Sequence, residues 1–283
     1  MPTRLLHRKI QAHKSEFGHI FIVAGSLRFS GAAVLCAGGA MRSGAGLVTL
    51  GVPEGIARPI IKIKSEEVML FPLPQTAETT LSFSGYKKIK DFSKGADIMV
   101  VGPGLSANPS TQRLARKIIS GIDKPMVIDA DGLNALAGHL DLLAKRRDSV
   151  SVLTPHPGEM ARLLGTTIKK VQANRRGIAA KFARDHHVTL VLKGYGTVIA
   201  DYNGNLHINE SGNPGMATGG TGDVLAGMVA AFLGLGLGAF EAAKYAAYAH
   251  GAAGDLAAKE KTQLSLIASD IIEKIPSAIK KNN

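Results

Sequence analysis

The sequence predicts an α/β fold in one domain spanning residues 1–283, with a mostly parallel sheet and an antiparallel addition at its C-terminal edge. Three observations lead to this prediction. Apolar, β-branched runs of strand length recur along the chain, as strands buried on both faces of a sheet require. Helical stretches separate several of these runs, which is typical of a parallel sheet covered on both faces. No repeat and no linker-like stretch divides the chain.

Six apolar runs predict the parallel strands. Each is nearly continuous and is bounded by Gly, Pro or Asp, so each is expected to lie buried in the sheet. The longest irregular piece is expected at Phe71–Gly85. The six runs are His19–Gly25, Gly46–Val52, Ala96–Gly102, Pro125–Asp131, Ser149–Pro155 and Val188–Gly194.

Three helical stretches are expected between these strands, at Ser30–Gly44, Asn108–Ile122 and Thr167–His187. Cys36, the single cysteine, excludes an internal disulfide and reads as a small buried core residue, which fits a reducing compartment. In the third stretch, apolar residues at spacings of 3, 4 and 7 predict one helical stripe. They are Ile168, Val171, Ile178, Ala179, Phe182 and Ala183.

The alternation of predicted strands and helices stops after Lys193. Residues 196–210 read as two short strands joined through Asn203-Gly204, a hairpin turn signal. Two helices are then expected, at Gly222–Gly236 and Gly238–Glu260. Val224–Phe240 contains 17 uncharged residues, but its glycines should break the helix near 234–238, so a buried helix is favoured over a membrane span.

Composition narrows the function classes. The net charge of +12 suits anionic ligands or nucleic acid, although general solubility explains it more simply. Aromatic residues make up 5% and Trp is absent, which argues against stacking platforms for single-stranded nucleic acid. The amino-terminal stretch has no apolar segment long enough for a signal peptide, so a cytoplasmic location is expected.

In open α/β sheets, ligands bind beyond the carboxyl ends of the strands. Two predicted strand ends carry glycines, Gly25–Gly31 and Gly102–Gly104, where a plain turn and close approach of the backbone to a ligand fit equally well. Ser30 is expected to cap the helix that starts near Gly31.

Polar side chains follow three further strands. Asp129, Asp131 and Asn134 could reach a metal or sugar hydroxyls, although Asp131 could equally be a helix N-cap. His156 stands between two prolines, so we expect a rigid, exposed imidazole and favour a ligand contact. Lys193 ends an apolar run and needs a partner, for which an anionic ligand and an ordinary salt bridge both fit.

The residue types near the C-terminus indicate an anion site. "GMATGGTGDVLAG" leads directly into an expected helix, so its free N–H groups would lie at the positive end of the helix dipole. Neither a Walker loop nor a dinucleotide fingerprint matches this pattern. Asp223 could be a simple N-terminal cap, but a carboxylate beside a bound phosphate suggests a base that takes a proton from an attacking hydroxyl.

"GGTGD" opening a late helix resembles the anion hole and catalytic Asp of the ribokinase-like superfamily, whose fold is a three-layer α/β/α sandwich. The chain is most similar to the ADP-dependent NAD(P)H-hydrate dehydratases, over residues 18–276. "TPHPGE" and "NPGMATGGTGD" are specific in combination. The other matching motifs are "GSLRFSGAA", "RSGAGLVTLGVPE", "SEEVM", "VGPGL", "DADGLNAL", "VLKGYGTVIA", "AHGAAGDLA" and "LIASDII".

The resemblance implies dehydration of the S-form of NADHX or NADPHX to NADH or NADPH, with ADP as co-substrate and Mg²⁺ as cofactor. Asp223 would be the base, and the N–H groups around Gly220 and Gly222 would stabilise the transferring phosphoryl group. The remaining implied contacts fall into two sets. The nucleotide would contact Lys193, Gly194, Tyr195, Gly196, Thr197 and Gly222; the hydrated dinucleotide would contact Ala32, Ala33, Gly104, His156 and Asp223.

The resemblance assigns no metal ligands, although Asp129 and Asn134 are candidates for the Mg²⁺. It also implies a homotetramer. No fused epimerase domain is seen in the sequence, so either a separate NAD(P)HX epimerase supplies that activity or spontaneous epimerisation suffices. Ser106 stands where the family pattern has Gly, and Tyr195 is bulky for its position. The alternatives are an ATP-dependent kinase of a small hydroxylated vitamin precursor and, less favoured, a nucleotide-sensing or nucleic-acid-binding protein.

Overall fold

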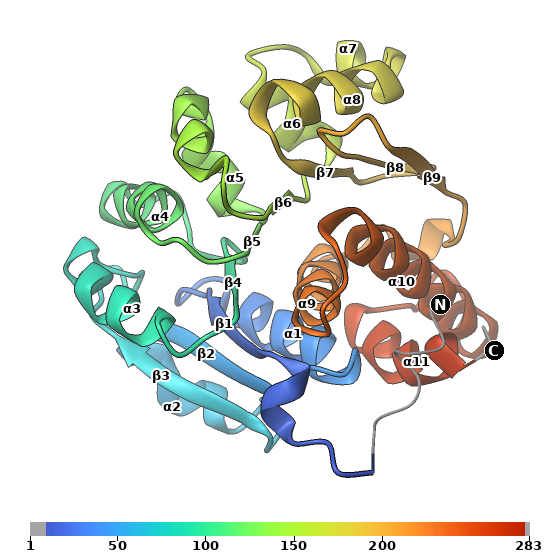
Figure 1. The fold of residues 1–283 in the computed structure, drawn as a ribbon. Coiled ribbons are helices and arrows are strands. Elements are labelled where there is room, and N and C mark those ends of the chain that lie inside the picture. Colours follow the sequence, from blue (N-terminus) through green and yellow to red (C-terminus); the bar gives the residue numbers. More distant parts are fainter. Residues whose placement is uncertain (1–9, 281–283) are drawn as a thin grey trace.

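The computed structural model describes residues 10–280; residues 1–9, part of the amino-terminal stretch considered above, and 281–283 lie outside that range. One nine-stranded sheet runs through it, in the order β3-β2-β1-β4-β5-β6-β7-β8-β9 (Figure 1). The strands are β1 (His19–Val23), β2 (Leu47–Pro53), β3 (Val68–Leu73), β4 (Ile98–Val101), β5 (Met126–Ile128), β6 (Ser151–Leu153), β7 (Thr189–Leu192), β8 (Thr197–Ala200) and β9 (Leu206–Asn209).

Strands β1 to β7 pair in parallel, whereas β8 and β9 are antiparallel additions at one edge. The mostly parallel sheet and its C-terminal antiparallel edge are therefore confirmed. The strand order reverses between β1 and β4, and ligands of such sheets bind beyond the carboxyl ends beside that reversal.

Helices cover both faces of the sheet and make two separate hydrophobic cores (Figure 1). Alternate strand residues feed the two cores: Ile20 and Ile22 of β1 join the first, Phe21 and Val23 the second. The first face carries α1 (Ser30–Arg42), α2 (Glu54–Ile61), α9 (Thr221–Gly234), α10 (Ala239–Lys261) and α11 (Ala268–Lys280). The second carries α3 (Tyr86–Ser93), α4 (Pro109–Gly121), α5 (Asp131–Leu136), α6 (Pro157–Leu163), α7 (Ile168–Ala173) and α8 (Arg175–His186).

Helices α1 and α9 touch through their backbones. A Cβ atom on Gly39 would lie 2.4 Å from the Val224 carbonyl oxygen, and one on Gly227 would lie 2.0 Å from the Cys36 carbonyl oxygen. Any side chain at either glycine would push the helices apart, because real Cβ contacts are not this short. The close packing fixes where the first turn of α9 lies relative to the sheet, and Cys36 is fully buried as expected.

Three expectations about local structure are wrong. The irregular piece at 71–85 begins inside edge strand β3. The single helix expected at 167–187 is two, α7 and α8, because the Asn174 side chain caps a new start by accepting from the Gly177 N–H; Ile168 is 54% exposed and leaves the stripe. Ser30 is the first residue of α1 and makes no capping hydrogen bond.

Two local predictions near the C-terminus are confirmed. The hairpin joins β8 to β9 through a turn that contains Asn203 and Gly204. The apolar run breaks between Gly234, where α9 ends, and Ala239, where α10 begins. No helix formed by residues 10–280 has the length and apolarity that crossing a membrane requires.

Candidate active site

The glycine-rich connection ends at the amino terminus of α9, as predicted. Gly220 is the N-cap in a left-handed conformation, with φ of 91°, and a Cβ there would lie 2.3 Å from Cδ1 of Leu35. The positive φ favours glycine at this position, because other residues adopt it only with strain. The first N–H groups of a helix have no acceptor within the helix, so the turn from Gly220 to Asp223 presents donors at the positive end of the α9 dipole.

A cluster of buried charges lies beneath this turn. Lys193, just after β7, places Nζ 2.7 Å from Oδ1 of Asp129 and 3.9 Å from Oε2 of Glu159. The Asp129 side chain is 1% exposed and that of Glu159 is 7% exposed. A Cβ on Gly222 would lie 3.1 Å from the same Nζ, so the ammonium group sits directly below the loop.

The cluster changes the protonation of its acids. Burial, and next the negative charge of Asp129, raise the pKa of Asp223 to about 7, while Lys193 opposes the rise. Burial likewise raises the pKa of Glu159, against the pull of Lys193. A carboxylate whose pKa lies near neutrality can accept a proton at neutral pH and release it again, which suits a general base.

The charge of Lys193 is therefore balanced by acids of the protein itself. Of the two alternatives, an anionic ligand and an ordinary salt bridge, the structure shows the salt bridge. Burial lowers its pKa more than any other single cause, but the charges of Asp129 and Glu159 and the hydrogen bond to Asp129 raise the pKa above its usual value. The amine thus stays charged beside Asp223.

His156 has a structural role that the sequence analysis missed. Its Nδ1 accepts hydrogen bonds from the N–H groups of Gly158 (2.9 Å) and Glu159 (3.3 Å), and Oε2 of Glu159 accepts from the His156 N–H (2.8 Å). This is a capping box with histidine in place of the usual Ser or Thr, so the view that only a ligand explains His156 is wrong. Its side chain is 53% exposed, and contact with the substrate remains a prediction.

Asp129, Asp131 and Asn134 divide between two networks. Asp129 belongs to the charge cluster. Asp131 is the first residue of α5 and not its N-cap, which is Ala130; its carboxylate accepts from the Ser106 N–H at 2.7 Å and from Nδ2 of Asn134 at 2.9 Å. Ser106 has a φ of 84°, a conformation that glycine adopts without strain, which is a physical reason for the glycine that the resemblance leads us to expect there.

The residues expected to contact the dinucleotide lie on two adjoining loops. Gly104 packs against Phe29 and Ala32: a Cβ on Gly104 would lie 2.7 Å from the Phe29 carbonyl oxygen and 2.9 Å from the Ala32 Cβ. Ala32 is partly exposed. Ala33 is fully buried, so Ala32 is the residue of the pair whose side chain offers surface. Contact of Ala33 with the dinucleotide stays a prediction.

The expected nucleotide stretch, residues 193–197, is the loop between β7 and β8. Gly194 and Gly196 have positive φ values of 129° and 62°, and Tyr195 projects fully into solvent. Arg175, which the sequence analysis did not select, shapes this loop. Its Nη2 donates to the carbonyl oxygens of Leu192 (2.9 Å), Lys193 (3.3 Å) and Gly196 (3.3 Å).

The family model for NAD(P)H-hydrate dehydratases matches residues 20–277. The chain belongs to this family. It is 43% identical over 278 residues to the bifunctional NAD(P)H-hydrate repair enzyme Nnr of Moorella thermoacetica, covering 98% of this chain and 52% of that protein. It is 39% identical over 257 residues to the ADP-dependent (S)-NAD(P)H-hydrate dehydratase of Neisseria meningitidis, covering 88% and 80%.

The solved structures agree. The ADP/ATP-dependent NAD(P)H-hydrate dehydratase of Bacillus subtilis, co-crystallised with ATP and Mg²⁺, matches with a TM-score of 0.83 at 31% identity, covering 98% of this chain and 94% of that one. The ribokinase-like three-layer sandwich is thereby confirmed. The chain spans about half the length of the bifunctional relatives that it matches.

Proposed function

We propose that this chain is a hydro-lyase that uses ADP to return the S-form of NADHX or NADPHX to NADH or NADPH, releasing AMP and phosphate. The observation that supports it most directly is Asp223, a carboxylate with a pKa near 7 in the turn that offers its N–H groups to an anion, in a chain of this family. A carboxylate beside a phosphate is repelled, so its presence at this position suggests that it takes part in the chemistry.

The reaction divides into two steps. Asp223 takes the proton of the hydroxyl at C6 of the hydrated ring as that oxygen attacks the terminal phosphorus of ADP and AMP departs. The N–H groups from Gly220 to Gly222 stabilise the charge on the transferring phosphoryl group. The ring nitrogen lone pair then expels phosphate from C6, and loss of a proton from C5 restores the ring double bond.

Mg²⁺ would neutralise the nucleotide phosphates. Among residues 10–280, no group of three or more His, Cys, Asp or Glu side chains is arranged to hold a metal ion. An ion held mainly by phosphate oxygens and water needs only one or two protein carboxylates, which this site can supply. Asp129 and Glu159, two acids next to Lys193, are candidates to hold the ion, together with Asn134 from the sequence analysis.

The remaining assignments divide between the two substrates. The 193–197 loop, including Lys193, Gly194, Tyr195, Gly196 and Thr197, would contact the adenine nucleotide together with Gly222. Ala32, Ala33, Gly104, His156 and Asp223 would contact the dinucleotide. We also propose a cytoplasmic homotetramer that depends on an epimerase activity for the R-form. Light scattering coupled to gel filtration tests the tetramer.

One assay tests the proposal. The protein is given hydrated NADH with ADP and Mg²⁺, and separately with ATP and Mg²⁺, and the recovery of reduced-nicotinamide absorbance is followed. We expect recovery with ADP. Absence of recovery with either nucleotide would contradict the proposal, and phosphorylation of a hydroxymethyl or hydroxyethyl vitamin precursor by ATP would favour the kinase alternative.

A further inference from the structure

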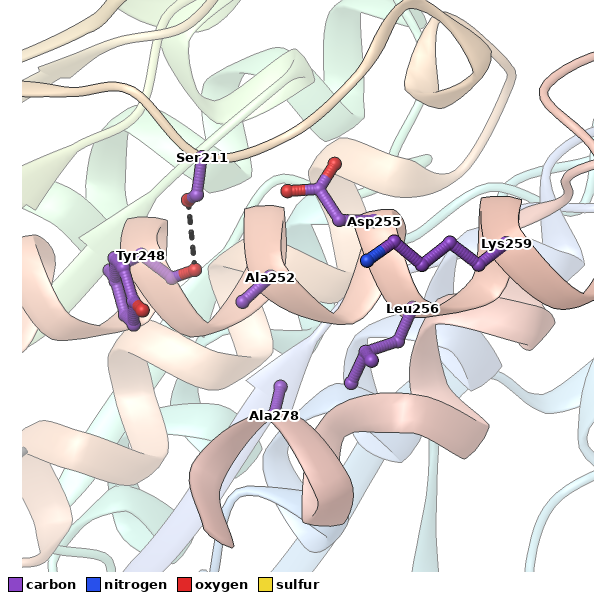
Figure 2. Close-up of a pocket in the computed structure, with 7 residues that line it drawn as sticks. All are labelled: Ser211, Tyr248, Ala252, Asp255, Leu256, Lys259 and Ala278. Carbon is purple, nitrogen blue, oxygen red and sulfur yellow. Dashed lines mark hydrogen bonds between the residues drawn. The ribbon is translucent and has the colours of Figure 1, made fainter. Parts of the chain in front are cut away.

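The segment between β9 and α9 lies on helix α10 and is tied to it by one carboxylate. Oδ2 of Asp255 accepts the Gly212 N–H at 3.0 Å, and Oδ1 accepts from Nδ2 of Asn213 at 2.9 Å. Oδ1 of Asn213 in turn accepts the Gly215 N–H at 3.0 Å. Figure 2 shows the Asp255 carboxylate rising from α10 towards this segment, so the carboxylate holds its first residues.

Two glycines of α10 leave room for the segment where it crosses the helix. A Cβ on Gly251 would lie 2.2 Å from Oγ of Ser211, and one on Gly254 would lie 2.3 Å from Sδ of Met216. The Ser211 hydroxyl donates to the Tyr248 carbonyl oxygen at 2.9 Å, the dashed contact in Figure 2. The two glycines let the segment lie directly on the helix backbone, within reach of Asp255.

The far end of the segment is held by the same helix. His250 is 9% exposed, and its ring interacts with the backbone of Thr221, the first residue of α9. Burial lowers the pKa of His250 to about 4, so the ring is neutral. The Thr221 hydroxyl donates to the carbonyl oxygens of Met216 (3.1 Å) and Thr218 (3.2 Å), which closes the loop on itself.

We propose that Asp255, acting through Asn213, is a positioning residue for phosphoryl transfer: it sets the course of the 212–222 loop and hence the direction of the N–H groups that meet the phosphoryl group. The inference rests on the proposed function. It also gives a role to the "AHGAAGD" motif of α10, which supplies a buried imidazole, two glycines and a carboxylate to a single loop.

The chemistry of the contact requires a carboxylate. Both groups that Asp255 meets, the Gly212 N–H and the Asn213 amide, are donors, and only an ionised carboxylate offers an acceptor oxygen to each. An amide at this position would turn one of its own donors towards a donor. Asp255 also borders a surface hollow of about 260 Å³ between α10 and α11, so its replacement leaves no sealed cavity and the variant should fold.

The test compares Asp255→Asn with a matched variant, Asp201→Asn. Asp201 accepts the N–H groups of Asn203 (3.0 Å) and Asn205 (2.8 Å) and the side-chain amide of Asn205 (2.8 Å), in the turn between β8 and β9. It therefore loses the same kind of contacts without touching the glycine-rich loop. Because displaced catalytic groups act mainly on turnover, we expect D255N to lower kcat about 10- to 100-fold with the KM for ADP changed less than about threefold.

A reversed pair sharpens the test. Combining D255N with N213D exchanges the positions of the amide and the carboxylate. The amide at 255 can then donate to the carboxylate at 213, and its oxygen can accept the Gly212 N–H. We expect the double variant to recover most of the lost kcat, whereas N213D alone should be impaired like D255N. A purely structural role would show as lost thermal stability in D255N without this recovery of kcat.

Hydrogen exchange supplies a readout that does not depend on activity. In D255N the amides of residues 212–222 should exchange faster than in the wild type, and in D201N they should not. If the wild type fails to turn over hydrated NADH, the proposed function fails while the exchange result still tests the loop anchor. If the wild type is active and D255N keeps kcat within twofold or exchanges no faster, the inference is overturned.

Discussion

Two cations, Arg146 and Lys193, lie at opposite ends of the strands with little exposure to solvent and are stabilised in different ways. Lys193, at the carboxyl ends of the strands, is surrounded by the acids Asp129 and Glu159. Arg146, near the start of β6 at the amino ends, is 3% exposed and has no acid within ion-pair distance among residues 10–280. Its guanidinium donates to the carbonyl oxygens of Ile119, Ile122, Lys124 and Val150 and to the Ser151 hydroxyl.

The difference separates a structural charge from a functional one. Every nitrogen of Arg146 has an acceptor. Burial lowers the pKa of Arg146 to about 10, while the charge of Asp123 opposes the fall, so the group remains charged. Around Lys193 the acids outnumber the cation, and burial together with the neighbouring negative charges raises the pKa of Asp223. A fully satisfied charge holds structure together, whereas an unbalanced cluster keeps groups ready to exchange protons.

The largest effect should come from Asp223→Asn. Removal of the base should lower kcat about 10³-fold, with nucleotide binding largely kept, as measured by turnover of hydrated NADH and by calorimetric titration of ADP. Near-normal turnover would make Asp223 only a helix cap.

The same variant should be more stable than the wild type at pH 8. The folded-state pKa of about 7 is above the unfolded value of about 3.9. Between these values the folded state holds a proton that the unfolded state has released, so stability falls as pH rises and the full cost is present above pH 7. Asn carries no such cost, so its gain in Tm should shrink on acidification towards pH 4. A lower Tm for D223N at pH 8 would contradict this view of the cluster.

Arg146→Met should show the opposite signature. It leaves the buried carbonyls of Ile119, Ile122 and Lys124 without their donor, which should lower the free energy of unfolding by about 3 kcal/mol. The corresponding fall in Tm is roughly 5–10 °C. Activity per folded molecule should be unchanged. The neighbouring exposed Arg147, replaced by Met, is the control and should change stability by less than about 0.5 kcal/mol.

Arg175→Lys tests a third cation. Like Arg146 it donates to backbone carbonyls, but like Lys193 it lies at the carboxyl ends of the strands, beside the candidate active site. Lysine cannot reproduce the planar donor set, so the 193–197 loop should loosen. We expect the KM for the nucleotide to rise about 5- to 10-fold with kcat changed less, because the loop binds the ground state as well as the transition state. Arg176→Lys, on the exposed side of α8, is the matched control. Equal kinetics for both variants would show that the loop does not need Arg175.

The fold was predictable where local signals agree with tertiary structure. The Asn203-Gly204 hairpin and the break after Gly234 depend on turn chemistry that acts over a few residues. Strand β3 was missed because Pro72 weakens its strand pattern, and an edge strand tolerates a proline that a central strand does not. The break at Asn174 was missed because the apolar spacing runs on across it.

The candidate site, like the fold, was predictable only where neighbouring residues carry the signal. Gly220 and Asp223 carry a local signature, a flexible turn and an acid at a helix start. Glu159 and Arg175 do not: the first looks like an ordinary first-turn acid, and the second opposes the dipole of its helix. Only the folded chain brings Glu159 to Lys193 and Arg175 to the loop after β7. The "H-x-x-E" spacing was the one signal that could have identified the His156 capping box.

The smallest expected effect is a shift in pH dependence that isolates one charge of the cluster. Because Asp223 must be ionised to act as the base, kcat/KM for the hydrate should rise with pH through a midpoint near 7. The charge of Glu159 contributes to raising the pKa of Asp223, after burial and the charge of Asp129. Glu159→Gln should therefore move the midpoint to lower pH, whereas Glu67→Gln, at an exposed position, should leave it in place. A midpoint that moves upward in E159Q, or a wild-type profile that is flat between pH 6 and 8, would mean that the crowded acids around Lys193 do not control the base.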